Sequence, residues 1–169
     1  MSARRITIGA GLAAMATIGA CLEPQPPRNR QSAEYIYEVV CGYPLNMWQS
    51  YDKAGDLNPE GFAFVMYLLS STTGKGVHTD GCIRVSMYEI NRGPEGISGR
   101  ILAHEWLADT ADLRERTPTS CGYGYDVYLH WGDLDVFGRE VEIVVRYEAP
   151  DGRVVQSQTK PTRVPARKV

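Results

Sequence analysis

Apolar and polar side chains alternate with a period of two from residue 62 onward, and this pattern limits the fold more than any other feature. In segment 123–131 the odd positions are apolar or aromatic, while Asp126 and His130 share the other face with Gly124 and Tyr128. Such a period is typical of a strand with one face on the core, because a helix would repeat every 3.6 residues. The residues expected to face the core are Ile83, Val85, Met87, Tyr123, Tyr125, Val127, Leu129, Trp131, Val141, Ile143, Val145 and Tyr147.

Other segments lack a clean alternation. Every residue from Phe62 to Leu69 is apolar, which fits a strand covered on both faces or a buried helix; the two phenylalanines and Val65 favour the strand. Residues 100–107 fit both periods, and we expect a strand there too. Residues 109–112 predict a single capped helical turn. Residues 41–60 are rich in Gly, Pro, Asn and Asp and are expected to form a loop.

Turn residues indicate how the last strands are joined. Residues 149–152 read Ala-Pro-Asp-Gly, in which proline presets its own φ and glycine tolerates a positive φ. Segments 140–148 and 153–159 should therefore pair as a hairpin. Pro161 and Pro165 confine the last strand to a sheet edge or end it, because proline has no N–H to donate to a ladder.

About seven strands at this spacing, without long helices between them, predict an all-β chain folded as an antiparallel β-sandwich. Segment 72–90, TTGKGVHTDGCIRVSMYEI, resembles the two-strand unit of transthyretin-like and other immunoglobulin-like bacterial modules. The resemblance implies an immunoglobulin-like fold of the kind found in accessory and adhesion modules. Those families carry no catalytic motif that matches this sequence.

The N-terminus has the features of an export signal. Arg4 and Arg5 precede fifteen uncharged residues, Ile6 to Ala20, fewer than the roughly 20 that a membrane-spanning helix needs. Ile18-Gly19-Ala20-Cys21 resembles the bacterial lipobox. This implies that the Cys21 thiol receives a diacylglyceryl group, that cleavage makes Cys21 the first residue, and that its amino group is then acylated. A secreted chain without lipid, or an uncleaved anchor helix, is the alternative.

The lipobox divides the chain into three parts. Residues 1–20 form the signal peptide, 21–34 the lipidated cysteine with a proline-rich tether, and 35–169 a single domain of ordinary size. Leu22 is not the aspartate that often retains such lipoproteins at the inner membrane. The resemblance therefore implies attachment to the outer membrane in a cell with two membranes, and otherwise to the extracytoplasmic side of the cell envelope.

Charge and cysteine content bear on partners. The 18 Lys and Arg against 20 Asp and Glu leave no basic excess for a nucleic-acid backbone, so nucleic acid is not an expected partner. Cys41, Cys82 and Cys121 remain once Cys21 is acylated, an odd number in an oxidising compartment. We favour a disulfide between Cys82 and Cys121, with three buried free thiols as the alternative.

The sequence carries no motif that indicates catalysis. His78, His104 and His130 lack the spacing of a helical metal site, and no nucleophile elbow, phosphate-binding loop or dinucleotide fingerprint is present. We expect neither enzyme activity nor a cofactor. A hydrolase that uses His104 or His130 with a neighbouring carboxylate as its base is the rival hypothesis.

Two further groups of residues suggest binding. Loop aspartates can supply oxygen ligands to calcium, although aspartate also favours turns by bonding nearby amides. Exposed aromatic rings stack on sugars or pack on protein partners, although tyrosine also fills half-buried strand positions. The calcium candidates are Asp80, Asp133, Asp135 and Asp151, and the candidate ligand surface comprises Tyr43, Trp48, Tyr51, Tyr88 and Tyr128.

These observations together favour a noncatalytic lipoprotein, held on a membrane by lipid on Cys21, that acts as a structural or binding module of the cell envelope. Its expected partner is an envelope protein or a glycan. A calcium-dependent or carbohydrate-binding module is the more specific form of this hypothesis.

Overall fold

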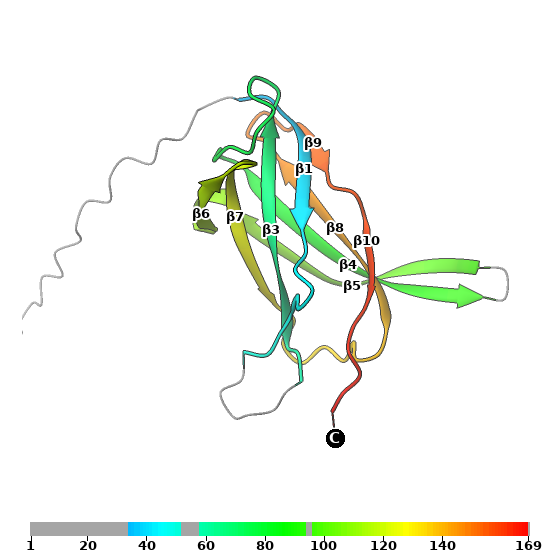
Figure 1. The fold of residues 1–169 in the computed structure, drawn as a ribbon. Coiled ribbons are helices and arrows are strands. Elements are labelled where there is room, and N and C mark those ends of the chain that lie inside the picture. Colours follow the sequence, from blue (N-terminus) through cyan, green and yellow to red (C-terminus); the bar gives the residue numbers. More distant parts are fainter. Residues whose placement is uncertain (1–33, 52–57, 94–95, 169) are drawn as a thin grey trace, which may run out of the picture.

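The computed structural model describes residues 34–51, 58–93 and 96–168, which form two antiparallel sheets packed face to face (Figure 1). The expected signal peptide, Cys21 and the expected tether up to residue 33 lie outside these ranges. The first sheet has the order β1-β3-β7-β6, with β2 beside β3. Its strands are β1 (Ile36–Gly42), β2 (Trp48–Gln49), β3 (Gly61–Ser70), β6 (Arg114–Thr119) and β7 (Gly122–His130).

The second sheet has the order β10-β8-β4-β5, with β9 also paired to β8. Its strands are β4 (Cys82–Gly93), β5 (Gly96–Asp109), β8 (Glu140–Glu148), β9 (Val154–Gln156) and β10 (Lys160–Arg163). If the eight strands on these two paths are lettered along the chain, the sheets have the spatial order A-B-E-D and G-F-C-C′, which is that of an immunoglobulin-like sandwich. The described residues hold ten strands rather than about seven. The short β2 lies in a segment that was expected to be loop, and the sequence pattern indicated no strand over β1 or β6.

The alternating positions face the core as expected, with one exception. The inward residues of β4 and β8 are buried, and so are the odd residues of β7 from Tyr125 to Leu129, together with Trp131. Tyr123 was expected in the core but is 48% exposed, because it lies at the start of β7, where its ring packs beside His78 at the end of the sandwich.

β3 is a strand, but it is covered on one face only. Phe62, Phe64, Met66 and Leu68 are buried between the sheets, while the residues that alternate with them are half-exposed on the outer face. The expectation of cover on both faces was wrong because a two-layer sandwich leaves one face of every strand toward solvent. Apolar side chains on that outer face hid the alternation from the sequence.

The remaining elements largely match their sequence signals. Residues 100–107 lie in β5, and Thr110–Asp112 form one 3-10 turn after Asp109, whose side chain makes no capping bond. β8 and β9 pair as a hairpin, and Pro161 lies in the edge strand β10. The described part of 41–60 is not all loop, because Trp48 of β2 pairs with Phe62.

The β4–β5 hairpin extends beyond the sandwich. β8 pairs with β4 only as far as Glu89, whereas β5 continues the pairing from Ile90 to Gly93. We call the segments Ile90–Gly93 and Gly96–Arg100 the arm, and Figure 1 shows it projecting from the side of the molecule. The contact between Arg92 and Glu140 ties the arm to the start of β8.

Candidate functional site

Rings and charged groups gather on the outer face of the first sheet. Alternation along β7 turns Asp126, Tyr128 and His130 outward, where the antiparallel register sets them opposite Val65, Ala63 and Gly61 of β3. We call this group the tyrosine face. It comprises Tyr51, Tyr67, Arg116, Asp126, Tyr128 and His130.

Tyr51 lies over Gly61 at one end of the tyrosine face. An added Cβ at Gly61 would lie 1.9 Å from the Leu129 carbonyl oxygen and 2.6 Å from Tyr51 Cε2, so both the close approach of β7 and the ring require glycine there. The His130 ring is 5.6 Å away, and Tyr51 and Tyr128 remain 40% and 53% exposed. Partial burial and the nearby Tyr128 raise the pKa of Tyr51, so its hydroxyl stays protonated at neutral pH.

The other end of the tyrosine face repeats this arrangement. The Tyr67 ring covers Gly124, where an added Cβ would lie 2.8 Å from the ring. The guanidinium of Arg116 donates to Asp126 Oδ1 at 2.8 Å, and this bond is the main reason that the pKa of Arg116 is raised. The Arg116–Asp126 pair therefore lies among the rings as a fixed set of donors and acceptors.

His130 is held by groups at the edge of the face. The Gly132 N–H donates to His130 Nδ1 at 3.1 Å, which directs Nε2 toward Glu60 Oε2 at 3.7 Å. Glu60 also accepts the Tyr51 N–H at 3.2 Å. Glu60 thus links the segment before β3 to both ring-bearing residues.

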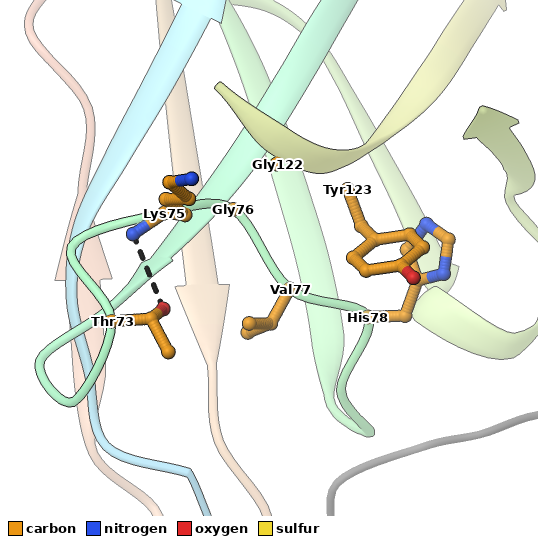
Figure 2. A pocket seen from close by; sticks show the side chains of 7 residues that line it. All are labelled: Thr73, Lys75, Gly76, Val77, His78, Gly122 and Tyr123. Carbon is orange, nitrogen blue, oxygen red and sulfur yellow. Dashed lines mark hydrogen bonds between the residues drawn. The ribbon is translucent and has the colours of Figure 1, made fainter. Parts of the chain in front are cut away.

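A separate cavity of about 250 Å³ lies where the β3–β4 connection crosses the start of β7. Figure 2 shows Gly76 and Gly122 between Thr73 and Lys75 on one side and the adjacent rings of His78 and Tyr123 on the other. His78 Nε2 lies 2.9 Å from the Gly124 carbonyl oxygen, and Nδ1 lies 3.6 Å from Glu115 Oε2. We call it the loop cavity.

Glycine at the floor of the loop cavity has a structural cause. The Gly76 N–H donates to the Cys121 carbonyl, and the Gly76 carbonyl accepts the Tyr123 N–H, each at 2.8 Å. An added Cβ at Gly76 would collide with the Tyr123 carbonyl oxygen, so only glycine allows these two backbones to approach. The glycines thus serve the chain crossing, whether or not a ligand binds there.

The two histidines of the rival hydrolase hypothesis have different surroundings. His130 faces Glu60, whereas the His104 ring packs edge-on against Trp106 at 4.5 Å. Trp106 Nε1 donates to the His130 carbonyl oxygen at 2.7 Å. The indole of Trp106 therefore contacts the His104 ring and the His130 backbone, but not the His130 side chain, through these two interactions. None of the cavities described is lined by His104 or His130.

The three cysteines within the described residues are free thiols. The favoured disulfide between Cys82 and Cys121 is not formed. Cys82 begins β4 in one sheet, and Cys121 lies in the β6–β7 turn of the other. Cys41 lies in β1 and is largely buried.

The four calcium candidates are divided between the two ends of the sandwich. Asp80 and Asp151 line one cavity after the end of β8, whereas Asp133 and Asp135 precede the start of β8. Asp151 accepts a bond from Arg153 Nε at 2.6 Å, which lowers the pKa of Asp151. Within the described ranges, no group of three or more His, Cys, Asp or Glu is placed to hold a metal ion.

The structure brings together only two members of the candidate ligand surface, Tyr51 and Tyr128. Tyr43 and Trp48 are half-buried against Phe64 and Phe62, and Tyr88 belongs to the second sheet. Sequence reasoning missed Tyr67, because it lies in an apolar run, and Arg116, because β6 has no clear alternation. The signal for Asp126 was present, since the period of β7 set it on the same side as Tyr128.

No family model, no curated protein and no solved structure matches this chain. No helix in the described ranges is long and apolar enough to cross a membrane.

Proposed function

We propose that this protein is an extracytoplasmic lipoprotein, held on a membrane of the cell envelope by acyl chains on Cys21, whose sandwich is a noncatalytic binding module. The observation that carries the proposal is Ile18-Gly19-Ala20-Cys21 at the end of fifteen uncharged residues. Each buried methylene contributes about 0.8 kcal/mol to membrane binding, so two or three acyl chains hold firmly where one does not.

The surface of the sandwich supports a binding role. Tyr51 and Tyr128 stay exposed side by side on the outer face of the first sheet, although both rings have a large apolar surface. Exposed rings beside ordered polar groups are a common feature of binding surfaces. The proline-rich segment between Cys21 and Glu34 would act as an extended tether of up to roughly 40 Å, at about 3.1 Å per residue.

Replacing the lipidated cysteine tests this proposal. The Cys21→Ala variant should leave the membrane fraction, and it should lose incorporation of labelled palmitate. Cys121→Ala is the matched control, because it removes an exposed thiol of the folded domain and should keep both properties. Intact mass of membrane-extracted protein should show a chain that starts at Cys21 with added acyl mass. A chain that retains Met1, or an unmodified Cys21, would refute the proposal.

A further inference from the structure

We propose that the tyrosine face binds an uncharged glycan chain of equatorially linked pyranose rings. This inference rests on the proposed function, because it names the ligand class of the same binding module. Four features of the face carry it: the rings, the ordered polar groups between them, the balance of charge, and the shape.

The rings supply stacking surfaces. Tyr51 lies over Gly61 and Tyr67 over Gly124, and Tyr128 projects from β7 between these positions. A pyranose ring with equatorial links presents axial C–H groups on both faces, and these pack on the negative face of an aromatic ring. The three rings lie along two neighbouring strands, so one extended chain of sugar rings could contact all of them.

The polar groups supply hydrogen bonds at fixed positions. Asp126 has a mostly buried side chain, and Arg116 bonds to it at 2.8 Å, with Arg114 Nε 3.9 Å from its other oxygen. A carboxylate held by arginine still has lone pairs for sugar hydroxyls, and the guanidinium still has N–H donors. Because the pair is already ordered, little side-chain entropy is lost when a hydroxyl binds.

The charge of the face favours a neutral ligand. The two positive charges of Arg114 and Arg116 are balanced by Asp126 and Glu60. Both arginines lie beside Asp126, and Glu60 lies 3.7 Å from His130 Nε2. A nucleic acid or a strongly charged peptide needs an excess of one sign, which this face lacks. An uncharged polyhydroxyl chain needs both hydrogen-bond donors and hydrogen-bond acceptors, and the arginines and carboxylates of the face supply both.

The shape of the face suits a chain rather than a small molecule. Glycine occupies positions 61 and 124, so no side chain projects from the sheet there, and the rings of Tyr51 and Tyr67 occupy the space. The antiparallel strands β3 and β7 continue this surface from Gly61 to Met66. A glycan can therefore pass along the face without its ends being enclosed, so internal sugar units should bind.

Calorimetric titration of the full-length, detergent-extracted lipoprotein tests the proposal. The probes are chitohexaose and cellohexaose, which are uncharged β-1,4-linked chains, and glucose is the single-ring comparison. We expect a hexasaccharide to bind and glucose to bind far more weakly. Tyr51→Ala and Tyr128→Ala should each weaken hexasaccharide binding about two- to thirteenfold, since a ring contact contributes about 0.5–1.5 kcal/mol.

Tyr123→Ala is the matched control, because Tyr123 is as exposed as the other two but lies at the loop cavity. It should leave binding unchanged. Near-ultraviolet circular dichroism should show that all three variants keep the native fold. Failure of both hexasaccharides to bind, or equal losses with Tyr123→Ala, would overturn the proposal.

A photo-crosslinker at position 128 adds a second readout in cells. Capture of glycan material supports the proposal, whereas capture of protein alone would assign the face to a protein partner and overturn it. Either result leaves the lipoprotein assignment standing, because that depends on the mass and location of the chain. Conversely, loss of that assignment would not alter the titration result.

Discussion

At the scale of single residues, Cys41 is a free thiol with a strongly altered pKa. Its thiol is buried between β1 and the segment that joins β9 to β10, with the Tyr43 and Ser157 side chains beside it. Burial disfavours the thiolate and raises the pKa of Cys41 from 9.0 to about 12. Because the thiolate is the nucleophile, this thiol should be inert at neutral pH.

The raised pKa of Cys41 predicts a loss of stability in alkali. Unfolding returns the thiol to its ordinary pKa of 9.0, so between pH 9 and 12 the unfolded chain binds fewer protons than the native one. The free energy of unfolding should then fall with rising pH, by about 1 kcal/mol from pH 9 to pH 10. Urea unfolding with reductant present measures it, and Cys41→Ala should show a shallower slope. Equal pH dependence of the free energy of unfolding in the two proteins would show that Cys41 does not cause the loss of stability.

At the scale of elements, the arm and the sandwich part of β4 differ in how many strands pair with them. Val85 and Met87 of β4 pair with β5 on one side and β8 on the other, and both are buried. Beyond Glu89 the arm is a ribbon of two strands. Two strands alone are marginally stable in water, because neither face is covered by a core.

Hydrogen exchange should therefore separate the two parts of the hairpin. Amides of the arm that pair across it, such as Asn91 with Gly99, should exchange about a hundredfold faster than those of Val85 and Met87, since local opening costs less there. Exchange followed by NMR or mass spectrometry measures this difference. Equal protection along β4 would show that the arm is covered by another surface.

At the scale of the whole molecule, aromatic side chains join the two sheets into one core. Trp106 of the second sheet packs on Phe62 of the first with centroids 5.5 Å apart, and Trp48 packs on both Phe62 and Trp131. The chain has three tryptophans, and all of them belong to this contact. Their fluorescence therefore reports the interface between the sheets.

This arrangement predicts one cooperative unfolding transition. Tryptophan fluorescence, which follows the contact between the sheets, and far-ultraviolet circular dichroism, which follows the strands, should give the same denaturation midpoint. Trp106→Phe should lower both midpoints together, because it removes packing and the bond to the His130 carbonyl. Separate midpoints in the unmodified chain would show that one sheet survives without the other.

The sequence by itself determined which residues of β4, β7 and β8 face the core, Tyr123 excepted, because a period of two is a local property of the chain. It also determined the edge position of Pro161, since proline lacks an N–H. Only the tertiary structure decided that Tyr51 lies beside Tyr128 and that Arg116 bonds to Asp126. Those contacts depend on which strands pair and in which register, and one alternating pattern is compatible with many pairings. The core could therefore be predicted, while most of the tyrosine face could not.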